Sequence, residues 1–374
     1  MEYNLESASE ETDLYSPIPL ELPVVAGWKE IPLKECGEPL EAIGPFSGNK
    51  YDRVFTNSIY FGEREDSPYG RDTLHGALIT TFARREVADQ LLEAEQQLPE
   101  GMHIIVLDAY RTLQVQQSLY EQYLEALRKQ RPDLTEQQLS DETQKFVSIP
   151  SNDKNRPSPH NTGGSIDVAI YDLQDAIEAQ VGQINERIQQ IGEDISQAEE
   201  VYRLEMERIS LIAQNARMLN FGTKWDHGGS EAALNYFEEL AGTRALTENE
   251  KEARRNRRLL YNVMINAGFE PYADEWWHYN SKKSQMGAKT AGQDKAEYGA
   301  MELSPNNWHH ELIRRKHLEG TEILTTVPIK TLGKMGRQIA WLEVALEAAQ
   351  IVGDMKETSL PEAAIIKPPE QEAA

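Results

Sequence analysis

Two short stretches of this chain hold side chains that can bind a divalent metal ion and move a proton. The first stretch contains His160 and Asp167, and the second contains Glu275 and His278. Two imidazoles and one carboxylate can hold a tetrahedral zinc ion and leave its fourth position open for water, as in catalytic zinc sites. A glutamate beside that water can accept its proton. Together the two stretches predict metal-assisted hydrolysis.

The spacing within each stretch sets a condition on the backbone. His160 and Asp167 are separated by a segment with two adjacent glycines, and a tight turn there lets a histidine and an aspartate on the next strand converge on one ion. Glu275 and His278 are three residues apart, which places them on opposite faces of a regular strand. Both can reach one metal only if Glu275 lies at a turn or bulge before the strand. Taken singly, neither pair is specific.

Arg111 is a candidate for stabilising an oxyanion. It follows a short apolar, β-branched run over residues 102–107, which predicts a buried strand ending at Asp108. The guanidinium could stabilise the developing charge of a tetrahedral intermediate. The alternative is a surface salt bridge with Asp108.

Apolar periodicity predicts the elements that position these residues. Helices are expected over 75–98, 112–129, 251–266 and 334–356, strands over 102–107 and 166–170, and an extended aromatic-rich segment over 269–279. Residues 130–157 are expected to form a surface loop with one short helix. His103 opens a buried strand and is expected to be a satisfied core residue, whereas His309 and His310 are expected at the surface.

Residues 172–219 have a different pattern from the rest of the chain. Apolar side chains alternate at spacings of four and three, which is a heptad seam, and Glu and Gln fill most other positions. We expect a pair of antiparallel helices or one long coiled-coil arm, with a possible role in homo-oligomer formation. The alternative is that the seam packs on the chain's own domain.

Bulk composition restricts the class of partner. The formal net charge of −24 argues against nucleic acid or an anionic membrane surface as a partner and favours a small substrate. No run approaches the roughly 20 apolar residues that span a bilayer. Cys36 is the single cysteine, and the first residues lack the pattern of a signal peptide, so a cytoplasmic location is expected.

The two stretches resemble the signature of the LAS-type zinc peptidases of the M15 class, which cleave D-amino-acid peptides. The resemblance rests on Ser158-x-His160-x-x-Gly163-x-Ser165-x-Asp167 followed by Glu275-x-Trp277-His278. Three further stretches are similar to the VanX-type D-alanyl-D-alanine dipeptidases: Asp108 to Arg111, Phe221 to Asp226, and Asn256 to Phe269. Trp276 stands where relatives that trim peptidoglycan stems more often have proline.

This resemblance implies a role for each matching residue. It implies one Zn²⁺ per chain, with ligands His160, Asp167 and His278. A zinc-bound water would attack the peptide carbonyl of D-alanyl-D-alanine or a similar small D,D-dipeptide. Glu275 would be the general base and Arg111 would stabilise the oxyanion. Asp226 would bind the substrate's ammonium group, and Ser158 would donate a hydrogen bond to its carboxylate.

The resemblance also implies an α+β fold, with a central antiparallel sheet, packed helices, a zinc site at the sheet's mouth and the long helical, coiled-coil-like insertion. The expected domains are a flexible N-terminal lead-in (1–22), a catalytic domain (23–171 and 220–284), the insertion (172–219), a C-terminal extension with a helix (285–357) and a disordered tail (358–374). Residues 130–157, 172–219 and 285–374 are extra relative to the family, and Ser165 replaces its usual alanine.

Two other functions stay open at this point. One is a D,D-carboxypeptidase or endopeptidase acting on peptidoglycan stem peptides, which would place the chain in cell-wall metabolism. The other is a scaffold or regulatory protein built on a peptidase body, although such proteins usually lose a ligand or the base.

Overall fold

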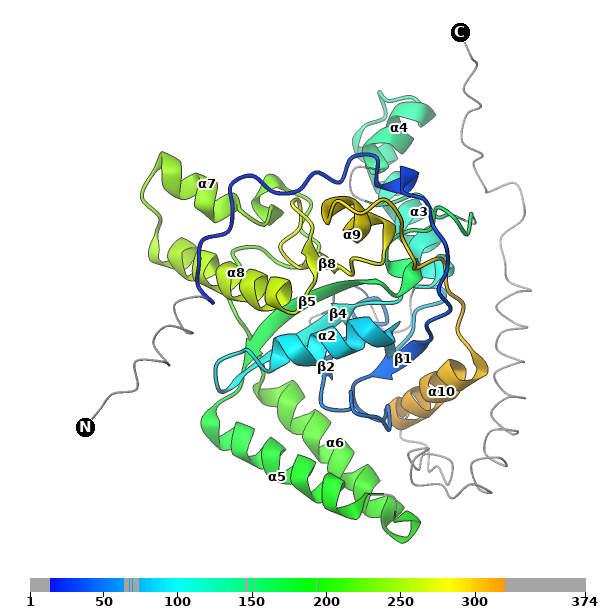
Figure 1. The fold of residues 1–374 in the computed structure, drawn as a ribbon, viewed down its shortest axis with the longest axis vertical. Coiled ribbons are helices and arrows are strands. Elements are labelled where there is room, and N and C mark those ends of the chain that lie inside the picture. The colour runs from blue at the N-terminus through cyan, green and yellow to red at the C-terminus, as the bar shows by residue number, and fades with distance from the viewer. Residues whose placement is uncertain are drawn as a thin grey trace.

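A six-stranded mixed sheet lies at the centre of the molecule (Figure 1). The structure is a computed structural model that describes residues 14–63, 67, 69, 74–144, 147–151, 153–192 and 194–319. The strands, in spatial order, are β2 (Phe55–Thr56), β4 (Met102–Asp108), β5 (Ser165–Asp172), β8 (His278–Asn280) and β7 (Glu270–Pro271), with β6 (Arg217–Met218) pairing beside β5. β2 runs parallel to β4 and the other pairings are antiparallel, so the α+β class holds but the sheet is not the purely antiparallel one expected.

The helix expected over 75–98 is shorter than predicted, because part of this segment forms a strand of a second, two-stranded sheet. β1 (Leu40–Ile43) pairs with β3 (Thr81–Arg84), and the helix α2 covers only Arg85–Glu95. The region before α2 contains adjacent threonines and a phenylalanine, residue types that favour strands. Pairing with β1, some forty residues earlier, outweighs the local helical periodicity.

The remaining expected helices of the body form close to their predicted bounds. α3 spans Leu113–Gln130, with the Thr112 hydroxyl accepting from the Val115 amide, and α8 spans Glu248–Asn266 behind a capping box of Thr247 and Glu250. α4 (Glu136–Thr143) is the one short helix expected within 130–157. The structure adds α7 (Tyr236–Thr243), α9 (Gln285–Thr290) and α10 (Pro305–Glu319).

The helix expected over 334–356 and the tail over 358–374 lie outside the described residues. No helix in the described part of the chain is long and apolar enough to cross a membrane.

His309 and His310, two adjacent histidines of α10, were expected at the surface, but both are buried. α10 packs against β1, and the Glu311 carboxylate accepts hydrogen bonds from the amides of Ile79 (3.1 Å) and Thr80 (2.8 Å). These partners lie more than 200 residues earlier, so no local pattern could reveal the contact. At the other end of the chain, part of the expected flexible lead-in also packs on the body, where Ile18 is buried in the main core.

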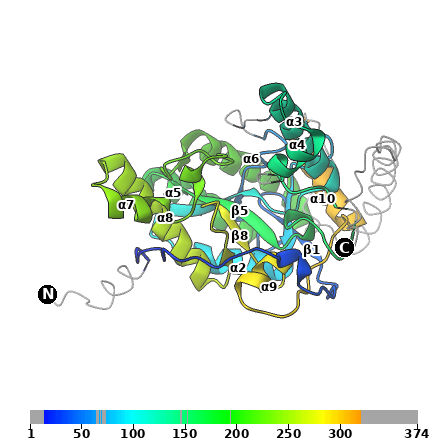
Figure 2. The ribbon, with the colours of Figure 1, turned by 90° about the horizontal axis from the view of Figure 1, so that it is seen from above.

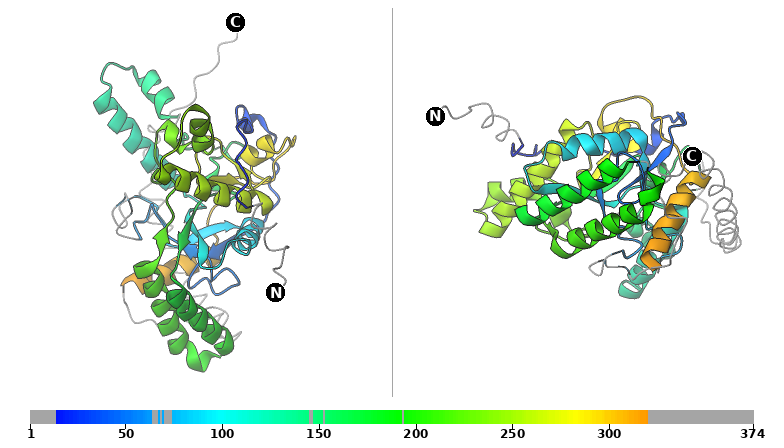
Figure 3. Two further views of the ribbon diagram at one scale, coloured as in Figure 1. Left: turned by 90° about the vertical axis from the view of Figure 1, so that its left-hand side faces the viewer. Right: turned by 90° about the horizontal axis from the view of Figure 1, so that it is seen from below.

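The insertion forms two helices, α5 (Asp175–Ile191) and α6 (Ala198–Asn215), which lie side by side and project from the body (Figure 3). The seam of α5 is buried against α6, in a cluster of Ile184, Ile188, Ile191, Val201 and Leu204. Most of the heptad seam is therefore covered within the helical pair, as expected for two helices packed on each other rather than for a helix packed on the domain. Coiled-coil character and a role in oligomers stay predictions. The insertion leaves the sheet at Asp172 and returns at Arg217, which are register partners in β5 and β6.

His103 joins the base of this helical pair to the body. Its two ring nitrogens lie 2.6 Å from a Glu95 carboxylate oxygen on α2 and 2.7 Å from one of Glu178 on α5, and Phe55 and Tyr171 contact the ring. Burial lowers the pKa of His103, but the bonds to Glu95 and Glu178 outweigh it and raise the pKa above its ordinary value. His103 is thus a satisfied, mostly buried residue, as expected.

Replacing His103 by glutamine is expected to destabilise the protein in acid more than in base. Because the folded-state pKa is raised, the stabilisation is fully present below about pH 6.5 and is lost as the pH rises through the raised value. We expect His103→Gln to lower the free energy of unfolding by about 1–3 kcal/mol at pH 6, and by less at pH 9, in urea titrations. His227→Gln, which removes an exposed pair with Glu231, is the control. An equal loss at both pH values would contradict the assignment.

Candidate metal centre

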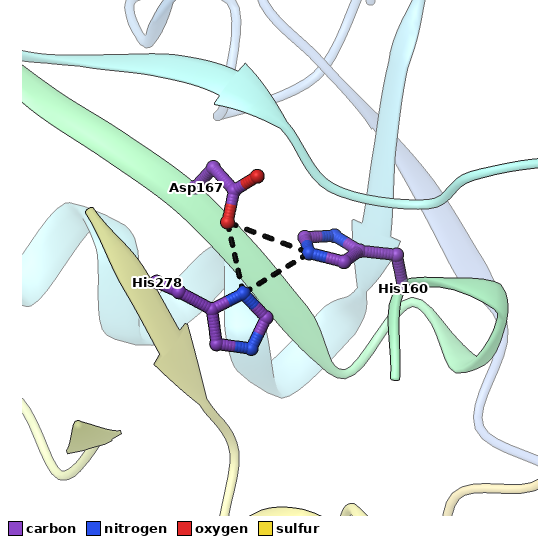
Figure 4. Close-up of side chains that lie close together, drawn as sticks. All are labelled: His160, Asp167 and His278. Atoms are coloured by element: carbon purple, nitrogen blue, oxygen red, sulfur yellow. Dashed lines mark hydrogen bonds and ion pairs between the residues drawn. The ribbon is translucent and has the colours of Figure 1, made fainter. Parts of the chain in front are cut away.

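Three buried side chains meet where β5, β8 and a short 3-10 helix (His160–Thr162) come together (Figure 4). His278 Nδ1 lies 2.9 Å from Asp167 Oδ1 and 3.1 Å from His160 Nε2, and the latter lies 3.4 Å from Asp167 Oδ1. Ligands bonded at about 2.0 Å to a tetrahedral ion are about 3.3 Å apart. The structure thus brings together all three predicted metal ligands with the separations that one ion requires.

Backbone pairing explains how residues far apart in the chain converge here. Asp167 on β5 and His278 on β8 are register partners, so their side chains emerge side by side from neighbouring strands. His160 is fixed to the end of β4, because the Arg111 amide donates to the His160 carbonyl oxygen at 3.1 Å. The turn after the 3-10 helix needs Gly163, whose φ is 67° and where a Cβ atom would lie 2.4 Å from a Leu40 methyl carbon.

The donor chemistry of the three side chains fits a bound cation. The remaining ring nitrogen of each histidine faces an acceptor: His160 Nδ1 lies 2.9 Å from the Ala109 carbonyl oxygen, and His278 Nε2 lies 3.2 Å from Asn280 Oδ1. If those nitrogens carry the protons, His160 Nε2 and His278 Nδ1 both present lone pairs beside a carboxylate. Three electron-rich atoms then converge, and a divalent cation would satisfy them. Ser165 donates to the same Asn280 oxygen at 2.6 Å and helps to orient it.

Glu275 lies at the turn that its spacing from His278 required. The His278 amide donates a hydrogen bond to the Glu275 carbonyl oxygen at 3.3 Å, which closes a turn, and β8 begins only at His278. The Glu275 carboxylate consequently turns to the same side as the ligands, 4.0 Å from His278 Nδ1, and is 31% exposed. Burial raises its pKa to about 7, whereas the adjacent His278 opposes the shift. A carboxylate with a raised pKa beside a metal site suits a general base that works near neutral pH.

Arg111 forms the salt bridge considered above and also faces the site. Its Nε and Nη2 donate to Asp108 Oδ2 at 2.9 and 2.7 Å, and its guanidinium lies over the Tyr60 ring at 4.6 Å. Nη2 is 3.9 Å from Asp167 Oδ2. The pair is largely buried rather than on the surface, with Arg111 12% and Asp108 8% exposed. Its guanidinium is held in one orientation at the edge of the ligand cluster.

One pocket of about 460 Å³ connects these residues. It is bordered by Arg111, the three candidate metal ligands, Glu275, Asp226, and a ring of aromatic and amide side chains that includes Trp28, Tyr60, Tyr69, Tyr123, Tyr272, Trp277, Gln116 and Gln144. Asp226 has a left-handed backbone (φ 60°) and accepts from the Tyr69 hydroxyl at 3.3 Å. Burial raises its pKa to about 6, while Arg111 opposes the rise. Ser158 is buried but does not border the pocket; its Oγ has no hydrogen-bond partner among the described residues.

Two comparisons with known proteins find dipeptidases. Residues 234–293, which include Glu275 and His278, match the peptidase M15 family model described as D-ala-D-ala dipeptidase. A D-alanyl-D-alanine dipeptidase from Synechocystis sp. is 25% identical over 264 residues, which are 67% of this chain and 84% of that protein. The resemblance to the VanX-type D-alanyl-D-alanine dipeptidases is confirmed. Both matches support a peptidase.

The paired tryptophans of the dipeptidase-like motif have separate roles. Trp276 is part of the core: its ring stacks on Phe221 at 4.1 Å, and its Nε1 donates to Thr223 Oγ1 at 2.9 Å. Trp277 instead borders the pocket, next to Trp225. This packing fixes the segment that carries Glu275 to the segment that carries Asp226.

Several pocket residues escaped sequence reasoning. Tyr60, Tyr69 and Gln116 contact Arg111 or Asp226, yet none belongs to the motif. Only Gln116 had a local signal, since it lies one helical turn beyond Thr112, the N-cap residue of α3. Viewed from above in Figure 2, β5 and β8 lie centrally, with α7 and α8 to one side and α3 and α4 to the other. The pocket thus draws residues from segments widely separated in the chain.

Proposed function

We propose that this chain is a zinc-dependent dipeptidase that hydrolyses D-alanyl-D-alanine or a similar small D,D-dipeptide. The observation that carries the proposal is the convergence of His160, Asp167 and His278 on the pocket that also receives Glu275 and Arg111. Two nitrogen donors and one carboxylate are a common ligand set for catalytic zinc. The dipeptidase matches supply the substrate class.

Zinc held by these three side chains would supply Lewis-acid chemistry, lowering the pKa of water and polarising the scissile carbonyl. Glu275 takes a proton from the attacking water on its carboxylate oxygen and then delivers that proton to the leaving amine. Arg111 donates N–H groups to the carbonyl oxygen as negative charge develops there, in a pocket lined in part by aromatic side chains.

The two ends of the substrate have different candidate partners. Asp226 is proposed to bind the ammonium group, because its carboxylate borders the pocket and is steadied by Tyr69. Ser158 is proposed to donate a hydrogen bond to the substrate's carboxylate. Its hydroxyl has no partner among the described residues and, although Ser158 itself does not border the pocket, the next two residues, Pro159 and His160, do. We also propose the catalytic domain as 23–171 with 220–284, and a cytoplasmic location in keeping with the single free cysteine, Cys36.

Product analysis separates this function from the stem-peptide alternative. The purified, zinc-loaded chain is incubated with D-alanyl-D-alanine, with L-alanyl-L-alanine and with a pentapeptide stem that ends in D-alanyl-D-alanine, and products are identified by mass spectrometry. We expect alanine from the D,D-dipeptide at a rate at least about 100-fold above that on the other two. A substrate that lacks or misplaces a hydrogen-bonding group leaves polar groups of the site unpaired, which costs that much or more. Release of alanine from the stem with the dipeptide uncut would instead show a D,D-carboxypeptidase.

A further inference from the structure

Gln116, on the first turns of α3, lies between Arg111 and the segment that follows α4. Its side chain is buried, 2% exposed. Its Oε1 accepts from Arg111 Nη1 at 3.0 Å, and its Nε2 donates to the Ser148 carbonyl oxygen at 2.7 Å. One amide group therefore bridges the guanidinium of the site and the backbone of the 130–157 extension.

The chemistry of its two neighbours explains why an amide is needed at this position. A guanidinium offers only donors and a backbone carbonyl only an acceptor, so the group between them must accept on one side and donate on the other. A carboxylate would face the Ser148 oxygen with a second oxygen, and an apolar side chain would leave buried polar groups unpaired. Glutamine meets both demands, and the two partners determine which side its amide oxygen and its amide nitrogen face.

We propose that Gln116 is a positioning residue for Arg111, an inference that rests on the proposed function. Asp108 engages Nε and one N–H of Nη2, and Gln116 engages one N–H of Nη1. A guanidinium has five N–H groups, so one remains on each terminal nitrogen. Bonded to Asp108 alone, the guanidinium could tilt about that contact. The second hydrogen bond, from Nη1 to Gln116, fixes the plane of the guanidinium and thereby sets the direction of its two remaining N–H groups.

The same bridge makes the extension part of the site. Gln144, Val147 and Ser148 belong to the extension and border the pocket. Gln116 holds the Ser148 backbone and Arg111 together, so this wall keeps a fixed distance from the group that contacts the scissile carbonyl. The extension then acts on the reaction through the orientation of Arg111 as well as through the shape of the pocket.

A double-mutant cycle on the zinc-loaded chain tests this inference. Gln116→Met keeps the length of the side chain and removes both hydrogen bonds. We expect kcat on D-alanyl-D-alanine to fall about 10- to 100-fold with KM changed little, because misorientation costs less than loss of the donor. In an Arg111→Met background, the same change should have no further effect on kcat. The matched control is Gln117→Met, because the exposed Gln117 amide donates to Glu121 of the same helix and Gln117 does not border the pocket.

Hydrogen exchange gives a readout that does not depend on catalysis. Peptides covering 147–155 should exchange faster in Gln116→Met than in the wild type, and at the wild-type rate in Gln117→Met. Zinc content and melting temperature are measured on each variant to exclude misfolding. Additive effects of Gln116→Met and Arg111→Met on kcat, or unchanged exchange at 147–155, would overturn the inference. A wild type that does not cleave the dipeptide would overturn the proposed function instead, and exchange at 147–155 would still test the bridge.

Discussion

Replacing Glu275 with glutamine is expected to remove nearly all turnover and to leave the metal bound. The amide is of the same size but cannot accept a proton from water, and general acid–base catalysis is typically worth about 10²–10⁴-fold. Glu275 lies 4.0 Å from His278 Nδ1 and is not one of the three clustered ligands, so their geometry stays intact. The measurements are kcat on D-alanyl-D-alanine and zinc content by elemental analysis.

Asp274→Asn is the matched control, because Asp274 is the exposed carboxylate next in the chain and does not border the pocket. A Glu275→Gln enzyme with near wild-type turnover would refute the assigned base. The wild-type pH profile offers a second check: a base works when ionised, so kcat/KM falls as the pH drops through its pKa. Burial raises that pKa to about 7 and a bound cation lowers it, so the acidic limb should lie below about pH 7 and vanish in the variant.

Changing Asp167 to asparagine is expected to weaken metal binding strongly and to lower activity with it. Asp167 is the one charged ligand of the cluster, and the adjacent His160 and His278 hold its pKa below the ordinary range despite burial. Outer-shell changes alone cost about 10- to 100-fold in metal affinity, so loss of the anionic ligand should weaken zinc by more than about 100-fold. Competition titration with a zinc indicator gives the affinity directly.

The matched control for this variant lies on the same strand. Asp172→Asn alters an exposed carboxylate at the far end of β5 and should leave zinc affinity unchanged. Added zinc should raise the melting temperature of the wild type and of Asp172→Asn, because a ligand that binds the native state stabilises it. An Asp167→Asn protein that still holds one zinc per chain would show that the ion binds elsewhere.

The candidate site could be predicted from sequence because its key residues lie in short motifs tied to turns and strand ends. The spacing of Glu275 and His278 required a turn before the strand, and the structure has one. His160 and Asp167 needed a glycine turn, and Gly163 provides it with its positive φ. In each case local backbone geometry restricts where the side chains can point, so few residues carry the information.

The features that sequence reasoning missed all depend on distant partners. Residues 75–84 have helical periodicity, yet pairing with β1 makes part of them a strand. The two histidines of α10 were expected at the surface, but they are buried because α10 packs against β1 and is bonded through Glu311 to the backbone at 79–80. Gln116 gains its role only because Ser148, 32 residues later, returns to meet it. Such contacts depend on how the whole chain folds back, which local propensity does not encode.

The register of β5 and β6 has a consequence for how this chain tolerates its insertion. Because Asp172 and Arg217 are opposite one another, the helical pair starts and ends at a single point of the sheet, as the loop of a β-hairpin does. Its length can vary there without displacing the strand positions of Asp167 and His278 several residues away. The helical pair α5–α6 can therefore change in sequence or acquire a binding role without altering the positions of Asp167 and His278 in the sheet.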